Sequence, residues 1–104
     1  FPGAAEAVDQ AGKTGEILVT GLSTPNDMKR FVKNGTVKTV VLWNTVDLGY
    51  LTVHAASALA KGDLAPGATT FTAGRLGELK IEGDNILLGD ILRFTAENID
   101  DYDF

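Results

Sequence analysis

The 104-residue sequence contains no cysteine, which excludes thiolate metal sites and thiol catalysis. Its single histidine, His54, has no serine or carboxylate at a spacing typical of a triad or a metal site, so we interpret it as structural. Basic residues are also scarce, with 9 Lys and Arg against 14 Asp and Glu and a net charge of −5. Because nucleic-acid affinity requires cations that meet phosphates, the sequence predicts no nucleic-acid partner.

Long hydrophobic runs are missing too. The longest strongly apolar stretch, residues 37–43, is interrupted by Lys38 and Thr39 and is far shorter than the ~20 residues of a membrane helix. We therefore expect no direct membrane insertion. The sequence starts at Phe1 without an initiator Met or an apolar leader, so we expect a signal peptide to have been removed or to lie upstream.

Residues 3–20 predict a short helix followed by a strand. Good helix formers fill residues 3–11, and Gly12 is a natural stop. The continuous apolar run Ile17-Leu18-Val19, within residues 16–20, is typical of a strand covered on both faces.

The clearest local pattern starts at Thr24. Thr24 is a helix N-cap, Pro25 takes the first helical position, and Asp27 stands three residues after the cap. Asn34-Gly35 supplies the C-terminal stop. The helix in between is expected to bury one apolar face, made of Met28, Phe31 and Val32.

Residues 37–43 predict a second buried strand directly after this helix. A strand, a capped helix and a strand of this total length form a crossover between parallel strands. The fold class is therefore α/β, with a partial parallel, Rossmann-like sheet.

The second half begins with a predicted helix over residues 45–61, ended by Gly62. Its apolar stripe is wide, which predicts deep packing. Residues 69–72 are extended, and the turn residues Gly83-Asp84-Asn85 separate two further apolar segments, so we expect a C-terminal β-hairpin. A short strand within residues 90–95 and an acidic tail, 97–104, with solvated carboxylates on the surface, complete the expected fold.

No motif in the chain predicts catalysis. Gly12-Lys13-Thr14 lacks the earlier glycine of a phosphate-binding loop, since Ala7 stands there, and it precedes a strand instead of a helix. Gly74-Arg75-Leu76-Gly77 lacks the third glycine of a dinucleotide fingerprint and predicts a turn. No nucleophile is paired with a base, so we expect no enzyme, no catalytic residue, no metal and no cofactor.

Two loops after the predicted strands are candidates for ligand binding, because open α/β sheets bind ligands at the carboxyl ends of their strands. In the first loop, capping explains Thr24 and leaves the Ser23 hydroxyl either to contact a ligand or to shape the turn. In the second, Trp43 can stack on a sugar-like ring while Asn44 hydrogen-bonds its hydroxyls. An ordinary core tryptophan is the alternative for Trp43.

Several strings occur together, in order and at sensible distances: Phe1-Pro2-Gly3-Ala4, Gly21-Leu22-Ser23-Thr24-Pro25, residues 32–38, Leu42-Trp43-Asn44, Asp47-Leu48-Gly49-Tyr50 and residues 97–104. They resemble type I periplasmic sugar-binding proteins of ABC transporters. The likeness is greatest to the autoinducer-2-binding and rhamnose-binding group, whose chains end in a similar tail.

This resemblance implies a protein about three times as long, with two α/β lobes that close on a ligand. Residues 1–104 would be its C-terminal portion, and the N-terminal lobe would be absent. On that mapping Pro2 and Ala4 match positions whose backbone lines the pocket, with Gly3 in place of the usual Ala. Ser23 and Trp43 replace the Asp and the polar amide that pentose and hexose binders carry, which weakens a ribose-type assignment.

The expected function is the periplasmic, substrate-binding component of an ABC transporter. It would capture a small sugar-like molecule of the rhamnose or autoinducer-2 type and deliver it to the permease. The alternatives are the effector-binding domain of a sugar-responsive transcription regulator, which shares the fold, and a sugar-processing enzyme, which the missing motifs disfavour. Apolar surface left exposed by missing parts could also let the fragment dimerise.

Overall fold

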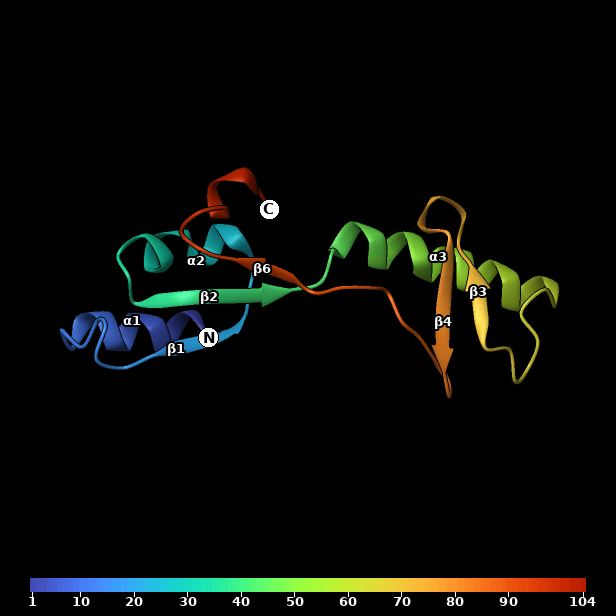
Figure 1. The fold of residues 1–104 in the computed structure, drawn as a ribbon, viewed down its shortest axis with the longest axis horizontal. Helices are drawn as coiled ribbons and strands as arrows, with labels where there is room; N and C mark the ends of the chain where they lie inside the picture. The colour runs from blue at the N-terminus through green and yellow to red at the C-terminus, as the bar shows by residue number, and fades with distance from the viewer. The chain divides into compact units, whose positions relative to one another are not determined.

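The computed structural model describes residues 1–104 and divides into two compact units. Unit 1 comprises Phe1–Leu42 and Ile91–Phe104, and unit 2 comprises Trp43–Asp90 (Figure 1). Unit 2 is therefore an insertion between two strands of unit 1. Those strands pair up to Leu42 and Leu92, next to the points where the chain leaves unit 1 and returns to it.

Unit 1 is an α/β unit with a three-stranded sheet in the order β1-β2-β6. The strands β1 and β2 are parallel and joined by α2, which confirms the predicted crossover, and β6 is antiparallel to β2. The elements are α1 (Pro2–Gln10), β1 (Val19–Leu22), α2 (Pro25–Lys33), β2 (Val37–Leu42), β6 (Leu92–Phe94) and the short 3-10 helix η2 (Ile99–Asp101).

Helix α2 begins and ends as its sequence predicts. Thr24 Oγ1 accepts a hydrogen bond from the Asp27 amide at 3.3 Å, with Pro25 as the first helical residue. Beyond the C-terminus, Gly35 has a φ of +86°, a left-handed conformation that glycine adopts without strain. These local bonds fix the length of α2 independently of its tertiary contacts.

The core of unit 1 lies where both helices and the C-terminal segment meet the sheet. One extra residue in β2 interrupts its register, since Val19 pairs with Val37 and Gly21 with Val40. This irregularity lets two valines that are three residues apart both face the core. The buried cluster consists of Ala5, Met28, Phe31, Val32, Val37, Val40, Leu42, Phe94 and Ile99.

The prediction that residues 16–20 form a strand covered on both faces is wrong in position and burial. The strand β1 starts at Val19, while Ile17 and Leu18 precede it and are 48% and 76% exposed. Lys13 accepts backbone hydrogen bonds from both Glu16 and Ile17, which form a turn in place of an extended segment. Hydrophobicity alone therefore placed the start of the strand too early.

The C-terminal tail lies across the surface of unit 1 as predicted, but Ile99 reaches the core. Ile99 is completely buried, and the Phe94 and Tyr102 rings meet edge to face with their centroids 4.7 Å apart. Phe104 extends this aromatic group, with its centroid 6.1 Å from those of both rings. Edge-to-face contacts of this kind add to the stabilisation from apolar burial.

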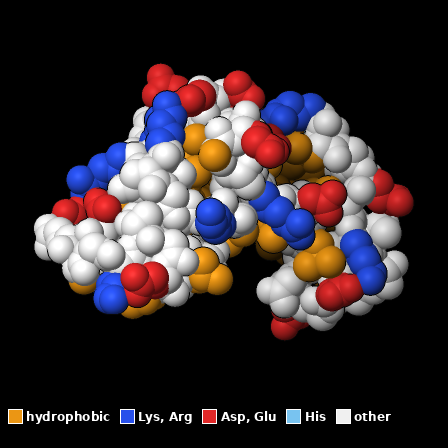
Figure 2. Space-filling model, turned by 60° about the vertical axis from the view of Figure 1, so that its left-hand side comes forward, with side chains coloured by type: hydrophobic (Ala, Val, Ile, Leu, Met, Phe, Trp, Pro, Cys, Tyr) orange, Lys and Arg blue, Asp and Glu red, His pale blue; other side chains and the backbone are white.

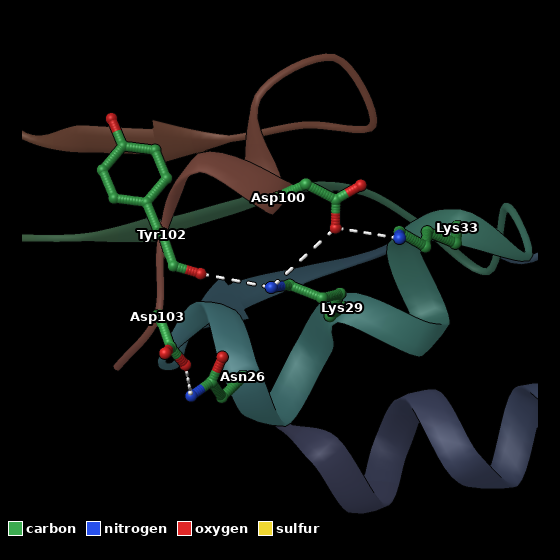
Figure 3. Close-up of polar contacts among 6 residues, drawn as sticks. All are labelled: Asn26, Lys29, Lys33, Asp100, Tyr102 and Asp103. Carbon is green, nitrogen blue, oxygen red and sulfur yellow. Dashed lines mark hydrogen bonds and ion pairs between the residues drawn. The ribbon is translucent and has the colours of Figure 1, made fainter.

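Polar contacts also attach the tail to α2 (Figure 3). Lys33 Nζ lies 2.8 Å from Asp100 Oδ1, and Lys29 donates a 3.1 Å hydrogen bond to the Tyr102 carbonyl. Asn26 Nδ2 donates to Asp103 Oδ1 at 3.1 Å. The tail carboxylates are exposed as predicted, although Asp100 and Asp103 also bind side chains of the helix.

Unit 2 combines one long helix with an antiparallel sheet in the order β3-β4-β5. Strands β4 and β5 form the predicted hairpin, although β5 is shorter than the apolar run 86–88, and the Gly74 segment is a turn as expected. The elements are α3 (Thr45–Lys61), β3 (Thr70–Thr72), the 3-10 helix η1 (Gly74–Leu76), β4 (Glu78–Glu82) and β5 (Asn85–Ile86).

The predicted deep packing of α3 is wrong. Leu51 is its only buried residue, while Val46, Val53 and Leu59 are 62–72% exposed. The physical reason is one of area, because strands of 3, 5 and 2 residues cannot cover the wide apolar stripe of a 17-residue helix. Hydrophobic side chains accordingly reach the molecular surface in Figure 2. No helix has the length and apolar character that a membrane span requires.

Candidate functional site

The two candidate loops start at the same edge of the sheet of unit 1. Strands β1 and β2 are parallel, and Leu22 pairs with Val41 near their carboxyl ends. Ser23 follows β1 directly, and the chain passes from Leu42, the last residue of β2, into the second loop. The expected position at the carboxyl ends of parallel strands is thus confirmed, although contact with a ligand stays a prediction.

The start of α1 lies beside the end of β1. A Cβ atom added to Gly21 would meet the Phe1 ring at 3.0 Å, so the ring packs directly on this glycine backbone. Phe1 is the N-cap of α1, which places Pro2 and Ala4 in the exposed first turn of that helix. Unit 1 therefore places the first turn of α1, which contains Pro2 and Ala4, beside the end of the strand that Ser23 follows.

Ser23 and Thr24 are distinguished by their hydrogen bonds. Thr24 caps α2, whereas the Ser23 hydroxyl is half-buried and makes no hydrogen bond within the chain. A hydroxyl carries one donor and two acceptor positions. Ser23 therefore has a hydroxyl in this loop that is not used by a hydrogen bond within the chain.

In the second loop Asn44 has a structural role that the sequence analysis missed. Its Oδ1 accepts a 3.0 Å hydrogen bond from the Asp47 amide, which makes it the N-cap of α3. The signal was present, since Asn44 and Asp47 repeat the spacing of Thr24 and Asp27. The Asn44 Nδ2 group makes no hydrogen bond within the chain, so this side chain has a donor group that could serve a ligand.

Trp43 precedes this cap and is 40% exposed. It is therefore not the fully buried core tryptophan that the sequence left open as an alternative. An indole with an accessible surface can stack on the apolar face of a ring. Trp43 and Asn44 lie in unit 2, and the other three predicted residues lie in unit 1.

Arg75 is a further residue of unit 2 that the sequence analysis did not single out. Its Nη2 lies 2.5 Å from Asp47 Oδ1, and its guanidinium carbon is 4.5 Å from the Tyr50 ring centroid. The Tyr50 ring in turn packs on His54 at 4.4 Å between centroids, in agreement with a structural histidine. The sequence pattern of α3 relates residues that are a few positions apart, so it gave no indication that Asp47 has a partner 28 residues away.

Neither unit holds three or more His, Asp or Glu side chains arranged to bind a metal ion. One carboxylate has a displaced pKa. A hydrogen bond from Lys33 lowers the pKa of Asp100. Desolvation opposes this shift, and the charges of Lys33 and then Lys29 add to the lowering. Asp100 binds the tail to α2 and is separate from the candidate loops, so its ionisation serves stability.

An α/β unit with candidate loops at the ends of its parallel strands is typical of a ligand-binding fold, and comparison with known proteins identifies the family. The periplasmic binding protein domain family matches residues 1–64, and the chain belongs to this family. A sugar ABC transporter protein from Actinomyces odontolyticus is 42% identical, with a TM-score of 0.77 over 99% of this chain and 34% of that chain.

Two further solved structures share the fold. An ABC transporter solute-binding protein from Clostridium phytofermentas with bound L-rhamnose is 28% identical, with a TM-score of 0.83 over 96% of this chain and 36% of that chain. LsrB from Clostridium saccharobutylicum in complex with AI-2 is 24% identical, with a TM-score of 0.82 over 99% of this chain and 36% of that chain. The predicted fold class, part of a type I periplasmic binding protein, is confirmed. The chain spans about a third of the length of these structures.

Proposed function

We propose that residues 1–104 are the C-terminal portion of a two-lobed, periplasmic solute-binding protein that captures a small sugar-like molecule and delivers it to an ABC transporter permease. The observation that carries this proposal is the 42% identity to a sugar ABC transporter protein over 99% of the chain. A solute-binding protein also agrees with the absence of catalytic motifs, because such a protein releases its ligand unchanged.

The proposed ligand is of the rhamnose or AI-2 type, the two ligands present in the related solved structures. The candidate contacts in unit 2 suit a hydroxylated ring. The exposed indole of Trp43 would stack on its apolar face, and Asn44 Nδ2 would donate to a ligand oxygen.

In unit 1 the proposed contacts are the Ser23 hydroxyl and the backbone around Pro2 and Ala4. Ser23 supports the proposal because its hydroxyl has no partner in the chain, while its neighbour Thr24 is occupied as a helix cap. Pro2 and Ala4 are exposed in the first turn of α1, next to the loop after β1. Their side chains are apolar, so main-chain groups would make the polar contacts.

Thermal denaturation of the complete two-lobed protein tests this function. A ligand that binds only the folded protein raises its melting temperature. L-Rhamnose or AI-2 should raise it more than ribose, and an absence of any shift would contradict the proposed ligand class.

The isolated 104-residue chain should bind weakly or undetectably, because it supplies only part of the contacts. Micromolar binding by calorimetry would contradict the proposed division of the protein.

We also propose that the isolated chain can dimerise through its exposed apolar side chains. Leu18 in unit 1 and Val46 and Val53 in unit 2 are 69–76% exposed. Apolar surface of this kind favours association. Light scattering over a range of concentrations tests this, and a monomer at every concentration would exclude it.

A further inference from the structure

The turn between β3 and β4 is attached to the first two turns of α3 by one residue, Arg75. Its guanidinium pairs with Asp47 at 2.5 Å and lies over the Tyr50 ring at 4.5 Å. Its backbone amide donates a 3.2 Å hydrogen bond to the Tyr50 hydroxyl. A planar guanidinium can pair with a carboxylate and stack on a ring at the same time, which the compact ammonium of lysine cannot do.

The backbone of this turn is fitted to the same helix. Gly74 has a φ of +48°, and an added Cβ would overlap the Tyr50 hydroxyl and lie 3.0 Å from His54 Cε1. Only glycine fits here without displacing the rings of α3. The contact between turn and helix is therefore close as well as charged.

Asp47 connects this contact to the candidate ligand loop. Its carboxylate is held by Arg75, while its backbone amide donates to Asn44 Oδ1, so one residue links the β3–β4 turn to the cap of α3. Trp43 immediately precedes that cap. Helix ends fray unless their terminal groups are held, and a frayed first turn would release both Trp43 and Asn44.

We propose that Arg75 is a positioning residue for ligand binding, which holds the first turn of α3 through Asp47 and thereby fixes Trp43 and Asn44 before the ligand arrives. This inference rests on the proposed function for its effect on affinity. Its effect on the loop itself does not require a ligand. Ordering side chains before binding removes an entropic cost from the binding step.

Trp43 is the only tryptophan of residues 1–104, so its fluorescence reports on this loop directly. In the ligand-free chain, Arg75→Met and Asp47→Asn should each make the indole more accessible to acrylamide quenching and lower its anisotropy. Arg75→Lys should give an intermediate value, because the charge pair remains and the stacking is lost. Arg93→Met is the matched control, since the exposed Arg93 has no ion pair and lies in unit 1.

In the complete protein, Arg75→Met should weaken L-rhamnose binding by roughly 2- to 10-fold, the range expected for ordering one side chain. The double variant with Asp47→Asn should be no weaker than the more affected single variant, because both changes break one contact. Unchanged quenching and affinity in a folded Arg75→Met protein would overturn the inference. If Arg75→Met fails to fold, Asp47→Asn and Arg75→Lys decide it by the same measurements.

The two proposals fail in different ways. Wild-type protein that binds neither L-rhamnose nor AI-2 would contradict the proposed function, while the quenching of Trp43 would still decide whether Arg75 orders the loop. A change in affinity with unaltered quenching and anisotropy would show that Arg75 does not act through Trp43, which contradicts the positioning role.

Discussion

Lys33, in the last turn of α2, and Asp100, in the C-terminal tail, form an ion pair with 2.8 Å between Nζ and Oδ1. The two residues are 67 positions apart, and no pattern around either one predicts the other. Their contact shows that the tail forms part of the αβ unit. It also makes the stability of unit 1 dependent on pH.

The first prediction concerns this dependence. Lys33 lowers the pKa of Asp100 in the folded chain, so the ionised carboxylate stabilises the fold at pH values above its unfolded pKa. That contribution is lost as the pH falls through the lower, folded pKa. Asp100→Asn should therefore lower the melting temperature slightly at neutral pH, and the difference from wild type should vanish in acid.

Asp101→Asn is the matched control, because the neighbouring Asp101 is exposed and makes no ion pair. Melting curves at low and high salt add a second check, since an exposed pair is screened by salt. A difference between Asp100→Asn and wild type that is unchanged from neutral to acidic pH would contradict the role of the ion pair.

The second prediction concerns the apolar part of the tail. Ile99 is completely buried in the core of unit 1, so Ile99→Ala should lower the free energy of unfolding by about 2–5 kcal/mol. Ile91→Ala, at a position that is 56% exposed, should change it by about 0.5 kcal/mol or less. Urea denaturation followed by circular dichroism measures both. Equal effects would mean that the tail is not packed in solution.

The elements of this fold were predictable wherever the signal is local. Thr24, Pro25 and Gly35 set the ends of α2 through bonds that span a few residues, and the structure follows the sequence there. Which apolar faces are buried in the tertiary structure was harder to predict. The apolar face of α3 resembles that of a buried helix, and only the small size of the neighbouring sheet shows that it is largely exposed.

The candidate site was predictable to the same extent. The positions of the two loops follow from the sequence, because parallel strands place their following loops at one edge, but the exposure of Trp43 needed the structure. The cap formed by Asn44 was visible in its spacing and was overlooked. The contact between Arg75 and Asp47 was not predictable, because it depends on how the hairpin folds back onto a helix 28 residues earlier.

The third prediction compares two glycines of unit 2 that should respond with opposite signs. Gly74→Ala places a Cβ in a left-handed conformation and against Tyr50, so it should destabilise unit 2 by more than about 1 kcal/mol. Gly49→Ala, within α3 and with no atom nearby, should stabilise it by about 0.5–1 kcal/mol. Two changes of the same sign in thermal denaturation would contradict the backbone conformation at one of these sites.

The fourth prediction separates the two roles assigned to Asn44. Asn44→Ala removes the N-cap of α3 and should cost about 0.5–2 kcal/mol, as should Thr24→Ala at the equivalent cap of α2. Asn44→Asp retains a cap acceptor but has no amide donor, so it should leave the melting temperature nearly unchanged. The ligand role is tested by binding. If Nδ2 donates to the ligand, Asn44→Asp should weaken L-rhamnose binding by the complete protein about tenfold, which is the equivalent of one lost hydrogen bond. Calorimetry measures this affinity. Wild-type affinity in Asn44→Asp would mean that Asn44 only caps the helix, and it would leave Trp43 as the ligand contact of this loop.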